Sequence, residues 1–152
     1  MSLASYTPET REVPLGRGNT FSVSGLSLQH IEILVRTHLE DIEALFDLIA
    51  DGAGNFEPDD LKKLAISLAT RAPGFVANVI ALAAGEHDAT ANAARLPMPV
   101  QIQAIHDIGE LTFTEVGGIK KFMETVAALL GTMSATMPKK LSKVTTRMMN
   151  PG

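Results

Sequence analysis

The chain has 152 residues, 45% of them hydrophobic, a length and a proportion that fit one globular domain with its own core. Cysteine is absent, which excludes a disulfide framework, a thiolate zinc site and a cysteine nucleophile. The net charge is −4, and because nine basic and 17 acidic residues precede Pro138, the body of the chain lacks the basic face of a protein that binds duplex DNA.

The two ends of the chain differ in composition from its body. Residues 1–11 are polar and predict a flexible N-terminal arm, with no apolar run that would indicate a secretion signal. Residues 12–137 predict a helical domain with an N-terminal hairpin. Residues 138–152 contain four basic residues and no acidic one, and predict a basic, methionine-containing tail. The uncharged stretch 72–85 is shorter than the about 20 residues that cross a bilayer, so we expect a soluble protein without membrane contact.

Two short alternating segments near the N-terminus predict a β-hairpin. The period of two that is typical of strands is kept by Val13, Leu15, Phe21 and Val23. A turn-rich tetrad, residues 16–19, separates the two segments. Because an isolated hairpin is marginally stable, its apolar face should pack against the helices.

The next segment predicts a single helix from Ser27 to Ile49. Ser27 has the character of an N-cap, and Leu26 before it can reach Ile31 as a hydrophobic staple. Apolar residues then recur at steps of three or four as far as Ile49, which is the period of one helix face. Two glycines shortly after Ile49 indicate where this helix stops.

Two prolines mark where later helices begin. Pro58 fits the first turn of a helix that runs to about Arg71, and Pro73 begins a largely apolar helix that ends at Gly85. Because the apolar residues of this second helix spread widely around its axis, it should be the most buried one. The alanine-rich stretch 88–94 indicates a further helical turn.

The remaining pattern predicts two more helices. One follows the prolines at 97 and 99 and continues to about Leu111. Thr112 and Glu115 have the spacing of a capping box and would begin the last helix, which Pro138 ends. The predicted fold is mainly α, a compact bundle of about five helices with a small N-terminal β-hairpin.

The stretch between the first two long predicted helices resembles a calcium loop. In residues 49–60, Gly54 falls at the sharp turn of an EF-hand loop and Phe56 at its apolar position. However, two ligand positions hold Ile49 and Ala53, which offer no side-chain oxygen, whereas a calcium site takes about six to eight oxygen ligands. An inter-helix turn is therefore the favoured interpretation.

The histidines do not form a convincing metal-binding pattern. His30 and His38 lack the one-turn spacing that chelates a metal on one helix face. His87 and His106 each precede an aspartate, as ligands in metal-dependent phosphohydrolases do, but the set is small. A polar helix face is the simpler explanation of the pair His106 and Asp107. We expect no metal, no other cofactor and no enzymatic activity.

Methionines gather near the C-terminus, and methionine is over-represented on surfaces that accept varied apolar partners. For Met123 and Met133, core filling is the alternative, since both continue a helical pattern. The candidate protein-binding residues lie on the last predicted helix and beyond it: Phe122, Met123, Val126, Leu130, Met133, Met137, Met148 and Met149.

Several segments carry a family resemblance, and together they span about residues 13–130. They are 21–27 (FSVSGLS), 39–46 (LEDIEALF), 72–86 (APGFVANVIALAAGE), 94–97 (ARLP) and 111–121 (LTFTEVGGIKK). In these segments the chain resembles the pre-tape-measure proteins, or tail assembly chaperones, of tailed phages and prophages. None of the segments is a catalytic signature. The arm before Arg11 and the tail after Pro138 depart from the resemblance.

The resemblance implies a tail assembly chaperone that binds the long, helical tape-measure protein and keeps it soluble while the tail tube assembles. It implies tail tube subunits as later partners, a location in the host cytoplasm, and absence from the mature virion. Several such proteins are also made in a longer, frameshifted form. We further expect self-association. The alternative is a structural virion protein, such as a tail terminator or connector subunit. A nucleic-acid binder acting through residues 138–152 is a third, less favoured class.

Overall fold

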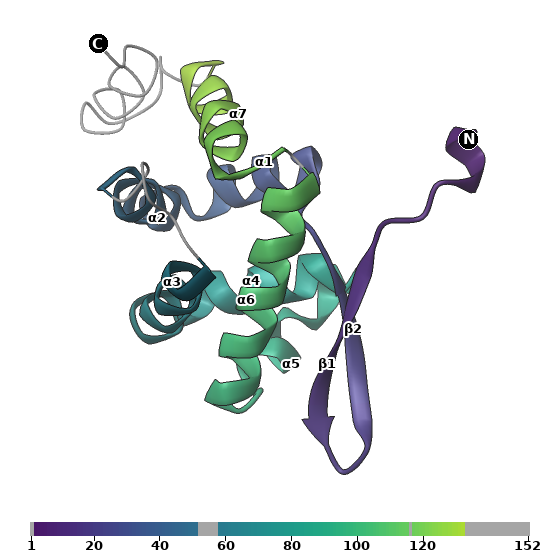
Figure 1. Ribbon diagram of the computed structural model, residues 1–152. Helices are drawn as coiled ribbons and strands as arrows, with labels where there is room; N and C mark the ends of the chain where they lie inside the picture. The colour runs from purple at the N-terminus through teal and green to yellow at the C-terminus, as the bar shows by residue number, and fades with distance from the viewer. Residues whose placement is uncertain (1, 52–57, 116, 133–152) are drawn as a thin grey trace.

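The computed structural model describes residues 2–51, 58–115 and 117–132. Within these ranges the chain forms a helical bundle from which a hairpin projects on one side (Figure 1). The elements are η1 (Leu3–Ser5), β1 (Thr10–Gly16), β2 (Asn19–Ser24), α1 (Leu28–Thr37), α2 (Leu39–Asp51), α3 (Pro58–Arg71), α4 (Pro73–Ala83), η2 (His87–Ala89), α5 (Thr90–Ala94), α6 (Met98–Glu115) and α7 (Ile119–Thr132). The predicted fold, mainly α and compact with a small N-terminal hairpin, is confirmed.

The hairpin forms because its turn has the residues that the geometry requires. Arg17 and Gly18 have φ angles of 57° and 77°, and two central residues with positive φ match the right-handed twist of the flanking strands. Val13 and Val23 are fully buried against the helices, as the alternation predicts. Leu15 is exposed instead, because the strand register shifts between Pro14 and Gly16 and breaks the alternation there.

The single helix predicted from Ser27 to Ile49 is wrong, because the chain bends at His38 into α1 and α2. His38 has a φ of −130° and a ψ of 50°, outside the helical region. Its ring is held on three sides. Nε2 lies 3.1 Å from Asn78 Nδ2 on α4, Nδ1 lies 3.3 Å from Asp41 Oδ2, and the ring packs edge-on against Phe75.

The N-cap of α1 is confirmed, with a histidine in the reciprocal position. Ser27 Oγ accepts a hydrogen bond from the His30 backbone N–H, and His30 Nδ1 accepts one from the Ser27 N–H, both at 3.2 Å. A capping box usually has Glu or Gln in the place of His30. The neutral imidazole serves the same purpose here because its Nδ1 can accept.

The centre of the bundle is α4, which is the most buried helix as its composition predicts. Every residue from Phe75 to Ala83 is buried. The bounds predicted for α3 are confirmed, and the helical turn predicted at 88–94 appears as η2 and α5. Within the described ranges no single helix is long and apolar enough to cross a membrane. Helices α3 and α4 together have the length and apolar composition of a membrane span, but they are bent by 119° relative to each other.

The predicted capping box at Thr112 and Glu115 is wrong, because α6 continues unbroken through both positions. Thr112 donates its hydroxyl to the Ile108 carbonyl at 2.6 Å, a bond available only inside a helix. The same Oγ1 accepts the Leu26 backbone N–H at 2.8 Å. Thr112 therefore connects the loop before α1 to α6 rather than starting a helix.

Two glycines join α6 to α7. Gly117 has a φ of 93° and Gly118 of 110°, values that other residues adopt only with strain. The Gly118 N–H donates to the Phe113 carbonyl and the Gly117 N–H to the Thr114 carbonyl, the pair of bonds that closes a helix C-terminus in a Schellman motif. The Gly118 carbonyl then accepts from the Phe122 N–H in the first turn of α7.

Candidate functional site: an apolar groove among the helices

An apolar groove has side chains of α2 and α3 as one wall and side chains of α6 and α7 as the other, and α1 and α4 contribute the rest of its lining. It consists of two adjoining pockets, one among α1, α2 and α7 and the other among α3, α4 and α6. The pockets share four lining residues, Leu26, Leu45, Phe75 and Phe122. Every other lining side chain is aliphatic, aromatic or methionine except for Gly109 and Thr112, and the Thr112 hydroxyl is already hydrogen-bonded.

Helix α2 contributes one wall of the groove through its spacing of apolar residues. Ile42, Phe46 and Ile49 follow one another at steps of four and three, and all three are buried. Leu45 on the same helix is only half-buried, so it stands at the rim. Leu48, one turn further along the helix, is 38% exposed and does not line the groove.

The second pocket depends on a close approach between α3 and α6, which belong to its two walls. At Gly109 on α6, an added Cβ would lie 2.7 Å from Leu61 Cδ1 on α3, which is closer than van der Waals contact allows. The missing side chain at Gly109 therefore lets Leu61 rest against the α6 backbone. Both residues line the second pocket, so this contact sets the width of the groove.

Helix α7 closes the groove with the residues that the sequence indicates for partner contact. Phe122 lies where the two pockets meet, and its ring packs edge-on against Phe113 at a centroid distance of 5.0 Å. Met123 and Val126 line the first pocket, whereas Leu130 is fully buried beyond both pockets. In the chain by itself all four α7 residues pack against the body, and Met123 at 1% exposure fills the core.

The other four candidate residues, Met133, Met137, Met148 and Met149, lie outside the described residues, as do Pro138 and residues 52–57 of the calcium-like loop. The partner-binding role assigned to the eight candidates stays a prediction. The groove also brings in residues that the sequence pattern did not single out, above all Leu45, Phe75 and Phe113. Their apolar character was visible, but Leu45 meets the other two only because the chain bends at His38 before α2.

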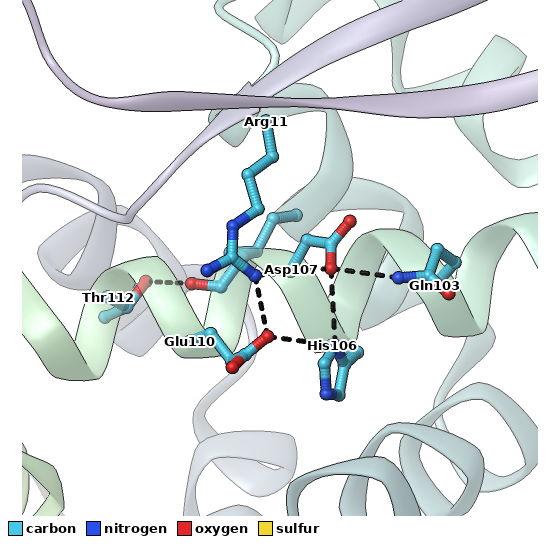
Figure 2. A network of polar contacts seen from close by, with 7 residues as sticks. Arg11, Gln103, His106, Asp107, Glu110 and Thr112 are labelled. Atoms are coloured by element: carbon cyan, nitrogen blue, oxygen red, sulfur yellow. Dashed lines mark hydrogen bonds and ion pairs between the residues drawn. The ribbon is translucent and has the colours of Figure 1, made fainter. Parts of the chain in front are cut away.

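A polar cluster on α6 anchors the hairpin to the bundle (Figure 2). Arg11 Nη1 on β1 lies 2.6 Å from Glu110 Oε1 and 3.6 Å from Asp107 Oδ1. The hydrogen bond to Glu110 raises the pKa of Arg11 above its usual value, against the opposing effect of burial. Asp107 also accepts a hydrogen bond from Gln103 Nε2 at 2.9 Å. His106 Nδ1 lies 3.3 Å from Asp107 and 3.4 Å from Glu110.

The same cluster offers three side chains, one imidazole and two carboxylates, that a metal ion could use as ligands. One ligand atom each from His106, Asp107 and Glu110 lie within 4.8 Å of one another. The Arg11 guanidinium, however, is hydrogen-bonded to Glu110 and close to Asp107, so a metal ion would meet a fixed positive charge at its own ligands. The arrangement therefore fits an ion-pair anchor for the hairpin better than a metal centre.

Comparison with protein families gives a match to the pre-tape measure proteins over residues 1–147, which includes both walls of the groove and the hairpin. Comparisons with curated proteins and with solved structures find no match. The family is related to phage tails and is not an enzyme class. Because the match covers almost the whole chain, the protein belongs to the pre-tape measure protein family.

Proposed function

We propose that this protein is a tail assembly chaperone that holds apolar helical segments of the tape-measure protein in its groove. The observation that supports this most directly is the continuous apolar lining from α2 to α7, open to solvent and bordered by the half-buried Leu45. The family name adds that proteins of this kind are associated with the tape measure. A long helical protein with apolar stripes aggregates when those stripes remain uncovered.

The groove suits an amphipathic helix as its ligand. Helix-in-groove recognition uses apolar side chains about one turn apart that enter an apolar cleft, and it needs few polar contacts. Each leucine-sized side chain that becomes buried contributes about 1.5–3 kcal/mol before the costs of association. Single contacts of this kind are weak, and several copies of the chaperone along one tape measure would cover it while remaining displaceable.

The same proposal includes where and when the protein acts. It binds the tape measure in the host cytoplasm, tail tube subunits then displace it, and it is absent from the mature virion. Weak individual contacts support such displacement because they release quickly. A structural virion protein, such as a tail terminator or connector subunit, would instead remain in purified particles.

The test is co-expression of the tape-measure protein with and without this chain. The chaperone proposal expects most of the tape measure in the soluble fraction, copurifying with this protein, only when both are present. It also expects this protein to be missing from purified mature particles. An equally insoluble tape measure in both cultures, or stoichiometric retention in particles, would contradict the proposal.

A further inference from the structure

Helix α7 is attached to the body as a bound amphipathic helix would be. Its buried side chains follow a helix-in-groove pattern, with Phe122, Met123, Val126 and Leu130 at positions i, i+1, i+4 and i+8. The first three line the groove, and Leu130 is buried just beyond it. The opposite face is polar, and Lys120, Lys121 and Glu124 are exposed there.

The contacts of α7 differ in kind from those of the hairpin. Polar pairs on α7, Lys121 with Glu124 and the Thr125 hydroxyl with the Lys121 carbonyl, lie within the helix. The hairpin is tied to α6 through the Arg11 ion pairs, and the segment that follows it through the Leu26 hydrogen bond to Thr112. The side chains that α7 buries against the body are apolar, and another amphipathic helix can replace them without leaving buried polar side chains unpaired.

The two glycines before α7 can serve as the hinge that such a replacement needs. Gly117 and Gly118 donate the hydrogen bonds that close α6, and the Gly118 carbonyl accepts the first hydrogen bond of α7. Glycine occupies other regions of φ and ψ at little cost, so a change at these two residues can swing α7, and it breaks only the two hydrogen bonds that close α6.

We propose that α7 is a displaceable wall of the groove, and that an amphipathic helix of the tape measure with the same apolar spacing binds by taking its place. This inference rests on the proposed function for the identity of the partner. In the free protein α7 covers apolar side chains of the groove, and this limits aggregation of the chaperone itself. The apparent affinity for the partner is then the intrinsic affinity multiplied by the fraction of molecules in which α7 has left the groove.

The variant Leu130→Ala tests the exchange directly. Leu130 holds α7 down without lining either pocket, so its truncation loosens α7 and leaves the groove intact. The probe is a labelled peptide with the sequence of Ile119–Thr132, which keeps the leucine that the variant lacks. The matched control is Leu82→Ala on α4, another buried leucine outside both pockets.

We expect the peptide to bind Leu130→Ala about tenfold or more tightly than it binds the wild type, and Leu82→Ala like the wild type. Equal affinity for all three proteins, or no binding to Leu130→Ala, would overturn the exchange. This result is independent of the tape-measure experiment. A tape measure that stays insoluble refutes the proposed function, whereas an unresponsive peptide refutes only the role of α7.

Hydrogen exchange in the wild-type chain provides a second measurement that requires no variant to fold. If α7 leaves the groove on its own, its amides should exchange at least about tenfold faster than those of α4, after correction for intrinsic rates. Equal protection in the two helices would mean that α7 opens only with global unfolding, and would overturn the proposal.

Discussion

Arg11 Nη1 on strand β1 lies 2.6 Å from Glu110 Oε1 on helix α6, although 99 residues separate the two in the chain. The contact, together with Asp107, fastens the hairpin along the helix that forms one wall of the groove (Figure 2).

Replacing Arg11 with methionine should weaken this anchor. The loss leaves Asp107 buried without its cation, and we expect the free energy of unfolding to fall by about 1 kcal/mol, a value reduced for the partial exposure of the arginine. Urea denaturation measures the change. The control is Arg36→Met, which removes an exposed pair with Glu32 and should change stability by no more than about 0.5 kcal/mol. Equal effects of the two variants would refute the anchoring role.

The cap of α1 should make stability depend on pH through His30. Burial lowers the pKa of His30 below its usual value of 6.5, with a smaller contribution from the charge of His87. The unfolded chain then binds a proton at His30 more readily than the folded chain does. The contribution of neutral His30 to the free energy of unfolding is therefore fully present above about pH 6.5, and it is lost as pH falls through the lower pKa of the folded chain. Protonated Nδ1 also cannot accept the Ser27 N–H.

The variant His30→Gln isolates that effect, because glutamine keeps a capping acceptor but does not titrate. Thermal unfolding of both proteins from about pH 7.5 to about pH 5 is the measurement. We expect the wild type to lose more stability than His30→Gln over this interval. Parallel curves would show that His30 does not titrate in the folded state as inferred.

The bend at His38 should be costly to remove, because the buried amide of Asn78 lies 3.1 Å from its ring. His38→Ala takes away this partner and should lower stability by about 2–3 kcal/mol. The double variant with Asn78→Ala should cost less than the sum of the two single variants. A double-mutant cycle in urea measures the coupling, and strict additivity would contradict the contact.

Gly109→Ala should separate stability from binding. The new methyl group pushes Leu61 aside into the groove, which offsets the roughly 1 kcal/mol that alanine gains over glycine in a helix. Gly131→Ala is the control, because its Cβ meets nothing within 4 Å and should simply stabilise α7. We expect Gly109→Ala to be near neutral in unfolding yet to copurify less tape measure. Wild-type recovery of the tape measure would show that the pocket at Leu61 is not used.

The sequence was sufficient to predict those elements in which local signals and the pattern of burial agree. Prolines at helix starts placed α3 and α4, and the spread of apolar residues around α4 predicted its central position. The hairpin followed from alternation and a glycine-rich turn. In each of these elements the residues that decide the structure lie close together in the chain.

The sequence failed where a distant side chain overrides a local pattern. The apolar period continues through His38, so only its contacts with Asn78 and Phe75 reveal the bend. Thr112 has the spacing of a cap, but the Leu26 N–H engages it within a continuous helix. The groove could not be derived for the same reason, since its two walls depend on the direction in which α2 leaves that bend.

A pair of leucines on one helix gives the most direct test that the groove holds the tape measure. Leu45 lines both pockets, whereas Leu48, one turn further along α2, is 38% exposed and lines neither. The measurement is the soluble fraction of co-expressed tape measure with Leu45→Glu or Leu48→Glu, after circular dichroism shows both variants folded. We expect Leu48→Glu to match the wild type and Leu45→Glu to lose most of the soluble tape measure. Equal solubility with the two variants would contradict binding in the groove.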